Sequence, residues 1–182
     1  MKQKIMQNIM YWEKHMNLEL VPESATVLHE ECLEFDFANP PIDPKELAQS
    51  LHDIMIKSDG LGLSANQVGL PYKVFVMRTG DEPFAVFNPK IVDISDRELV
   101  MKEGCLSFPL LYLNVKRSDG VRIRYQKEDG STTTEKFIGM TARIALHEFD
   151  HMIGKVYTQK ASTFETHRAL HKRMILKRKV KK

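Results

Sequence analysis

The chain has 182 residues, of which 42% are hydrophobic, and a formal net charge of +3. This length allows one well-buried core and is too short to favour two, so we expect a single domain over residues 1–182. The small net charge excludes a protein that binds polyanions over its whole surface. No apolar run is long enough to span a bilayer, and we expect neither a membrane nor a specific nucleic acid as a partner.

Residues 1–17 are predicted to be an N-terminal extension to which the sequence assigns no function. They mix charged residues with short apolar steps and lack the continuous hydrophobic segment of a secretory signal. The two cysteines, Cys32 and Cys105, are too few for a disulfide framework, and a reducing compartment suits a cysteine that binds a metal. Together these observations predict a cytoplasmic protein.

The first clear element is a helix that begins near residue 43, after an irregular stretch over residues 18–41. Asp43 can cap this helix, because its side chain can accept hydrogen bonds from the first free backbone amides, and Pro44 suits the first turn. Leu47, Leu51 and Ile54 recur at helical spacing and should face the core. We expect the helix to end at Gly60.

A glycine-rich segment over residues 60–69 follows this helix. Gly60 and Gly62 would let the backbone pass close to a ligand or to another chain segment, and the sequence leaves both readings open. The segment lacks the third glycine of a dinucleotide-binding loop and the Gly-Lys-Ser/Thr ending of a phosphate-binding loop. Nucleotide binding is therefore disfavoured.

The middle of the chain has the alternating pattern of β-strands. We predict strands at residues 74–77, 84–87, 91–92, 121–125 and 132–137, with turns at 80–83, 88–89 and 128–130. Residues 163–182 suggest a basic C-terminal helix or tail with Phe164, Leu170 and Ile175 facing inward. The fold class is therefore α+β, with mixed or antiparallel β-sheets packed around a central metal-binding helix and flanked by N-terminal and C-terminal helices.

That central helix is predicted to run from a cap at Thr141 to an end near Gly154, and it carries His147, Glu148 and His151. Residues four apart lie on one face of a helix, so both histidines can point at one cation. Glu148 lies beside the pair, where it could act as a general base on a water molecule. The alternative is a helix whose histidines only pack or cap.

A metal site of this kind needs a third ligand. Cys105 follows Gly104 and precedes a proline turn, and metal coordination would deprotonate its thiol. A lone cysteine is more often a small buried hydrophobic residue, so Cys105 alone does not decide the question.

Three segments in order resemble the signature motifs of the peptide deformylases. They are Gly-Leu-Gly-Leu-Ser-Ala-Asn-Gln at 60–67, Glu-Gly-Cys-Leu-Ser at 103–107 and His-Glu-Phe-Asp-His at 147–151, and the resemblance covers roughly residues 20–161. It implies removal of the N-formyl group from the initiator methionine of nascent polypeptides, with N-formyl-methionyl peptides as substrates and formate as a product.

The resemblance also implies roles for single residues. Cys105, His147 and His151 would hold one divalent metal ion, with Fe²⁺ the expected ion and Zn²⁺, Ni²⁺ or Co²⁺ able to take the same site. Glu148 would take a proton from the attacking water and deliver it to the leaving amine, while the Gln67 side chain and the Leu106 backbone N–H would stabilise the oxyanion.

For substrate binding, the resemblance implies backbone pairing of an extended peptide with three residues and an apolar pocket for the methionine side chain. The pairing residues are Leu61, Gly62 and Gly104. The pocket residues are Met140, Ile144 and the aliphatic stem of Arg143. Arg117 is placed to form an ion pair with Asp150 or Glu103.

The chain departs from the family pattern at three positions, which leaves the preferred substrate length open. Ser64 stands where the family usually has Ala, Leu146 where Gln usually precedes the first metal-binding His, and Tyr112 where some bacterial members have Arg. The basic C-terminal tail could dock on the ribosome or could be a solvated helix end.

Two alternatives to the deformylase remain at this stage. One is a two-histidine zinc peptidase that takes its third ligand from Glu165, His167 or His171, although Tyr157 occupies the position where a metzincin has His. The other is a ribosome-binding or RNA-binding module with a metal-stabilised fold, and steep salt dependence of binding would identify it.

Overall fold

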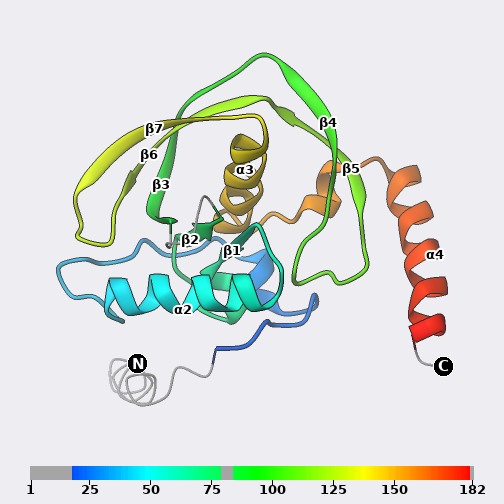
Figure 1. Ribbon diagram of the computed structural model, residues 1–182, viewed down its shortest axis with the longest axis horizontal. Coiled ribbons are helices and arrows are strands. Elements are labelled where there is room, and N and C mark those ends of the chain that lie inside the picture. Colours follow the sequence, from blue (N-terminus) through cyan, green and yellow to red (C-terminus); the bar gives the residue numbers. More distant parts are fainter. Residues whose placement is uncertain (1–17, 79–83, 181–182) are drawn as a thin grey trace.

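The computed structural model describes residues 18–78 and 84–180, and the predicted extension at 1–17 and turn at 80–83 lie outside them. The fold is α+β, as predicted: antiparallel sheets surround one central helix, α3 (Figure 1). Among the described residues, no helix has the length and apolar character needed to cross a membrane. The single-domain organisation and the cytoplasmic location stay predictions.

The larger sheet has five strands in the order β1-β2-β3-β6-β7, and every neighbouring pair is antiparallel. The predicted turn at 128–130 is confirmed, because Lys127 N–H donates to Ser131 O at 2.8 Å and Gly130 takes a φ of 79°. The strands are β1 (Gly62–Ser64), β2 (Val74–Met77), β3 (Phe84–Ile94), β6 (Gly120–Gln126) and β7 (Thr132–Ile138).

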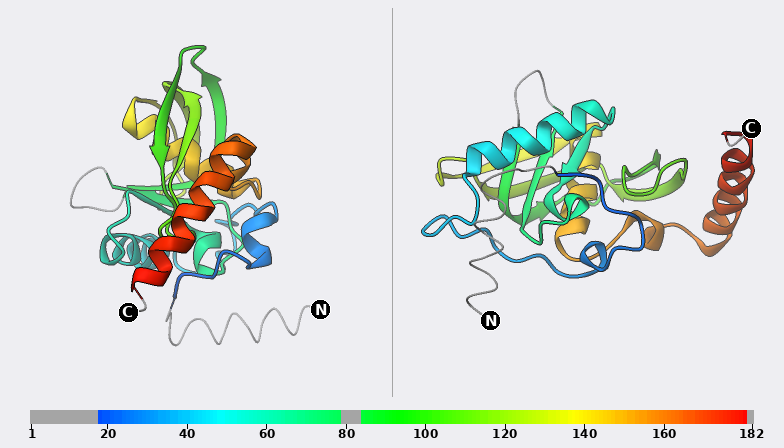
Figure 2. Two further views of the ribbon diagram at one scale, coloured as in Figure 1. Left: turned by 90° about the vertical axis from the view of Figure 1, so that its right-hand side faces the viewer. Right: turned by 90° about the horizontal axis from the view of Figure 1, so that it is seen from below.

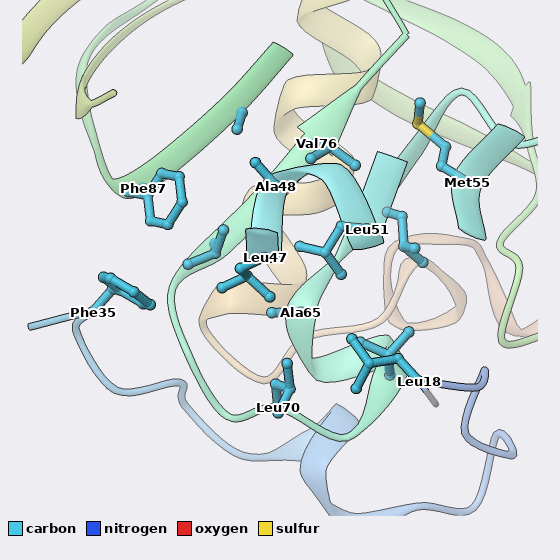
Figure 3. Close-up of a cluster of buried hydrophobic side chains, with 14 residues drawn as sticks. Leu18, Phe35, Leu47, Ala48, Leu51, Met55, Ala65, Leu70, Val76 and Phe87 are labelled. Carbon is cyan, nitrogen blue, oxygen red and sulfur yellow. The ribbon is translucent and has the colours of Figure 1, made fainter. Parts of the chain in front are cut away.

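Strand β2 is buried on both faces because a different helix covers each face of the sheet. Val74 and Val76 face a cluster under helix α2 (Pro44–Lys57), together with Leu47 and Leu51 (Figure 3). The alternate residues Phe75 and Met77 face a second cluster, which includes residues of helix α3 (Met140–Met152). Alternation along a strand therefore anchors α3 and α2 to opposite faces of one sheet.

Helix α2 begins as predicted but ends earlier than predicted. The Asp43 carboxylate accepts hydrogen bonds from Lys45 N and Glu46 N at 2.9 and 3.0 Å. The helix stops at Lys57 rather than at Gly60, because Asp59 takes a left-handed φ of 52°. Gly60 has a packing role instead: a Cβ there would lie 2.8 Å from Leu106 Cδ1, so glycine lets the second motif approach the first.

The N-cap of helix α3 lies two residues before the predicted cap, Thr141. Gly139, with a φ of 61°, is the N-cap residue, while the Thr141 hydroxyl donates to Ile138 O at 2.9 Å instead of capping the helix. Gly154 follows the end of the helix with a φ of 68°, in agreement with its predicted role. A Cβ at Gly154 would lie 2.8 Å from His29 O, so the chain also passes closely here.

The sequence did not predict the hairpin of β4 (Glu98–Glu103) and β5 (Leu113–Ser118), which forms the second, two-stranded sheet. The backbone of β3 and β6 continues into this hairpin and arches over α3 (Figure 1). Strand β3 is also continuous where two short strands were predicted, because a shift in register between Phe87 and Lys90 absorbs Asn88-Pro89.

Helix α4 (Thr163–Val180) lies at one edge of the molecule, beside β5 and away from the larger sheet (Figures 1 and 2). The prediction that its apolar residues face inward is wrong: Phe164 is 77% exposed, Leu170 43% and Ile175 40%. Polar contacts hold the helix instead: the buried Arg173 donates to Glu23 Oε2 at 2.6 Å, and Asn114 Nδ2 of β5 donates to Glu165 Oε1 at 3.0 Å. Three short 3-10 turns complete the described part of the fold, at Thr26–His29, Ala65–Val68 and Tyr157–Lys160.

Candidate metal centre and substrate groove

The three predicted metal ligands meet in the structure. One ligand atom each of Cys105, His147 and His151 lies within 4.8 Å of the others, and the Cys105 Sγ atom is 3.4 Å from His151 Nε2. Both histidines are buried on α3, and Cys105 follows β4 in the loop before β5. The alternative third ligands, Glu165, His167 and His171, lie on α4 and do not belong to this group.

The residues of this group fit a divalent metal ion. Two imidazole nitrogens and one thiolate are donors that transition metals accept, and three protein ligands leave room for a reacting molecule. Beside them, the Glu148 Oε2 atom is buried and has no hydrogen-bond partner among the described residues. Since a buried carboxylate oxygen is normally paired, this unpaired atom indicates that a water molecule or cation belongs at the site.

Glu103 fixes the orientation of the first histidine. The Nδ1 atom of His147 lies 3.0 Å from Glu103 Oε2, so Nδ1–H can donate there and Nε2 is left for a metal. Burial would raise the pKa of Glu103, but hydrogen bonds from His147 and Arg117 outweigh it and lower that pKa to about 2. Glu103 is therefore ionised at neutral pH and accepts hydrogen bonds from these residues.

Arg117 joins the Glu103 carboxylate to helix α3. Its Nε and Nη2 atoms donate to the two oxygens of Glu103 at 2.7 and 3.0 Å, and its Nη1 atom donates to Asp150 Oδ2. The sequence suggested Asp150 or Glu103 as its partner, and the side chain binds both. The two acidic residues come from β4 and α3, so one buried guanidinium ties the segments that carry the ligands.

The guanidinium of Arg143 makes a second tie that the sequence did not reveal. Its Nη1 atom donates to Glu103 Oε1 at 2.7 Å and to Val115 O at 2.9 Å, and Nη2 donates to Leu99 O at 2.6 Å. The predicted role used only the aliphatic stem, and Arg143 is among the residues that line the groove. An arginine on the buried face of a helix needs several hydrogen-bond acceptors. That requirement could have predicted polar partners for the Arg143 guanidinium.

Glu148 is buried beside the two histidines. Burial raises its pKa to about 7, although the nearby charges of His147 and Arg117 act in the opposite direction. A carboxyl group with this pKa can both accept and release a proton near neutral pH.

A 3-10 turn over Ala65–Val68 positions Gln67 with its amide group facing the second motif. The Gln67 Oε1 atom accepts a hydrogen bond from Ser64 N at 3.0 Å, and Nε2 lies 3.3 Å from Cys105 Sγ and 3.2 Å from Ser107 Oγ. The neighbouring Asn66 also has a role that sequence reasoning missed, because its Nδ2 atom donates to His151 O at 2.9 Å.

A cavity of about 480 Å³ opens over these residues. It is lined by all the predicted site residues except His151, which is only 1% exposed. The predicted residues that line the cavity are Leu61, Gly62, Gln67, Gly104, Cys105, Leu106, Met140, Arg143, Ile144, His147 and Glu148.

Two glycines bring the backbone close to the reactive groups. A Cβ at Gly62 would lie 2.5 Å from Glu148 Oε1 and 2.9 Å from Ile144 Cγ2, and a Cβ at Gly104 would lie 2.8 Å from the Tyr112 ring. Both positions therefore require glycine because another chain segment passes closely, which confirms one of the two readings of the glycine-rich segment. Leu61 and Gly62 also line the cavity, and their contact with a ligand stays a prediction.

Comparison with known proteins identifies the group to which this geometry belongs. The family model of polypeptide deformylases matches residues 17–167. The chain belongs to the polypeptide deformylase family. A peptide deformylase of Thermotoga maritima is 36% identical over 136 residues, which cover 75% of this chain and 79% of that protein.

Solved structures of deformylases share the fold as well. That of Thermotoga maritima has a TM-score of 0.73 and 33% identity, and the match covers 81% of this chain and 99% of the other. A deformylase from Synechococcus elongatus in complex with actinonin has a TM-score of 0.78 and 29% identity, covering 88% and 87% of the two chains. The protein is thus a deformylase that removes the N-formyl group from nascent polypeptides, and the zinc-peptidase alternative is wrong.

Proposed function

We propose that this deformylase acts on N-formyl-methionyl peptides with Glu148 as its general acid–base group and with Cys105, His147 and His151 as ligands of Fe²⁺. The observation that carries the proposal is the unpaired, buried Oε2 atom of Glu148 next to three converging donors in one groove. When bound, the ion supplies a Lewis acid that polarises the formyl carbonyl oxygen. Zn²⁺, Ni²⁺ or Co²⁺ would suit the same donors.

Glu148 would accept a proton from the attacking water and return it to the amine that leaves. Its raised pKa of about 7 supports both steps, because the carboxyl group changes protonation state close to neutral pH. Gly62 leaves room for this carboxylate, because a Cβ there would lie 2.5 Å from Glu148 Oε1. The position of the Glu148 carboxylate matters, because displacement of a general base by about 1 Å can lower the rate by on the order of a hundredfold.

Gln67 and Leu106 would stabilise negative charge on the formyl oxygen. The Gln67 Oε1 atom is occupied by Ser64 N at 3.0 Å, which turns the Nε2 donor toward the loop of Cys105. Leu106 follows Cys105 directly and lines the same cavity, so its backbone N–H is near the ligand set. Donors that are fixed before the reaction stabilise a developing oxyanion without reorganisation.

The peptide would bind in the groove as an added strand. Leu61 and Gly62 would pair with it on one side and Gly104 on the other, so that its affinity depends mainly on the backbone and tolerates many sequences. Met140, Ile144 and the stem of Arg143 would surround the methionine side chain, and all three line the cavity.

The experiment that tests this function is an assay of formyl-Met-Ala-Ser with anaerobically purified protein. We expect stoichiometric release of formate with no cleavage of the Met-Ala bond, and no reaction with the acetyl-Met-Ala-Ser control. Reconstitution of the metal-free protein with each of the four ions should give the highest kcat/KM with Fe²⁺. Cleavage of the peptide bond, or equal release of acetate, would contradict the proposal.

We further propose that the basic end of α4 contacts the ribosome. Lys177, Arg178 and Lys179 lie in the last turn, and Leu170 and Ile175 are exposed nearby. Deletion of residues 177–182 should weaken sedimentation with ribosomes and reduce its salt dependence, while hydrolysis of a short formyl-peptide stays within about twofold. Equal sedimentation of both forms would favour a helix end that is only solvated.

A further inference from the structure

One rim of the groove carries a cation on an aromatic ring. The Nζ atom of Lys102 lies 4.9 Å from the centroid of the Tyr112 ring, and both residues line the cavity. Lys102 is exposed on β4, and Tyr112 is 55% exposed just before β5. An ammonium group on an aromatic face is held in place while its remaining donors stay free for a ligand.

The charge of Lys102 has no neutralising partner within residues 18–78 and 84–180. Among the described residues, no carboxylate lies within salt-bridge distance of its Nζ atom. The other exposed charge on the cavity wall is Asp59, which lies 3.6 Å from Arg78 Nη1. The carboxyl and guanidinium groups deeper in the cavity are those of Glu103, Arg143 and Glu148; all three are buried, and Glu103 and Arg143 bind each other.

This cation also lies next to the path of the peptide. The Tyr112 ring packs on Gly104, where an added Cβ would be 2.8 Å from Cε1 and 3.0 Å from Cδ1. Gly104 is the residue proposed to pair with the peptide backbone, and Leu110 and Pro109 extend the same wall. Residues that follow the formylated methionine should therefore pass the ring and the ammonium group.

We propose that Lys102, held on Tyr112, is a specificity-determining residue that favours an acidic side chain in one of the first two residues after the methionine. The inference rests on the proposed function, because it needs the peptide to pair with Gly104. Side chains alternate along an extended strand, so one of these two positions should respond more strongly than the other. An exposed ion pair of this kind corresponds to a preference of about two- to fivefold.

The test compares kcat/KM for formyl-Met-Ala-X and formyl-Met-X-Ala, where X is Glu, Gln or Lys. All peptides carry a C-terminal amide, so that a terminal carboxylate cannot replace the side chain. The wild type should prefer Glu to Lys by about two- to fivefold at one position, and about 0.5 M salt should remove most of the preference.

Variants then assign the preference to this pair of residues. Lys102→Glu should invert it, Tyr112→Phe should keep it, and Tyr112→Leu should weaken it because the ammonium group loses its support. The matched control is Lys116→Glu, which makes the same change of charge on the same hairpin outside the cavity lining. The control should leave the Glu to Lys ratio unchanged.

An unchanged ratio in Lys102→Glu at both positions, with the Gln peptide still hydrolysed, would overturn the inference and leave the proposed function standing. A wild type that hydrolyses no peptide, including the Gln peptide, would overturn the proposed function and the inference with it. The neutral peptide therefore separates the two failures.

Discussion

At the scale of single residues, chemistry at the site depends on close approaches that only particular side chains allow. Gly62 lies against Glu148, and Cys105 lies 3.4 Å from His151 Nε2. The sequence predicted these residues because each belongs to a motif whose chemistry is local and whose spacing survives folding. It could not predict Asn66 or the guanidinium of Arg143, because their partners lie far away in the chain: backbone carbonyl groups for both and the Glu103 carboxylate for Arg143.

The two cysteines provide a matched test of the metal centre. Cys105→Ala should lose the bound metal, since two imidazoles alone hold a divalent ion much more weakly. Cys32→Ala should keep the metal, because burial raises the pKa of the Cys32 thiol to about 11 and leaves it a small apolar group. Metal analysis of both purified variants checks this, and a Cys105→Ala protein with a full equivalent of metal would contradict the ligand assignment.

Gly62→Ala tests the approach of the first motif to the general base. A Cβ there would lie 2.5 Å from Glu148 Oε1, so we expect the carboxylate to move and kcat to fall by about a hundredfold with metal retained. The control is Gly120→Ala, whose Cβ would have its nearest neighbour at 3.5 Å. Steady-state kinetics that show equal rates for the two variants would disprove the role of this contact.

At the scale of elements, buried ion pairs and hydrogen bonds hold the β4–β5 hairpin on helix α3. The predictable elements had local signals: Asp43 as a cap, alternation in β2, and the turn at Gly130. The hairpin of β4 and β5 was missed because its inward residues include charged Glu103 and Arg117, which hide the apolar alternation. Their pairing across the site is a tertiary property, so no local pattern could reveal it.

Arg143→Met tests how much these buried polar contacts contribute to the free energy of unfolding. The change would leave Leu99 O and Val115 O without their partner and remove one cation from Glu103, which should cost about 3 kcal/mol of unfolding free energy. The control, Arg97→Met, breaks an exposed contact with Asp119 and should cost less than about 1 kcal/mol. Urea unfolding of both variants measures this, and equal losses would contradict the account.

At the scale of the whole molecule, a sheet whose strand β2 is buried on both faces packs against the helix with two of the proposed ligands, and an arching hairpin brings the third. The fold class and the three motifs were predictable because hydrophobic alternation and ligand spacing are patterns within short stretches of sequence. The position of α4 was not, since the apolar residues Phe164 and Leu170 suggested a buried face and the structure leaves both exposed. The polar contacts of α4 join residues far apart in the chain: Arg173 pairs with Glu23, and Glu165 accepts a hydrogen bond from Asn114.

The central claim is that Glu148 moves the proton while Cys105, His147 and His151 hold the ion, and Glu148→Gln tests it most directly. Metal content and formate release from formyl-Met-Ala-Ser should be measured on the same anaerobic preparation of this variant and of the wild type. We predict a full equivalent of metal in both, and a kcat lower by at least about a thousandfold in Glu148→Gln, because the amide keeps the shape but cannot accept the proton. A metal-loaded variant that releases formate within about tenfold of the wild-type rate would contradict the account.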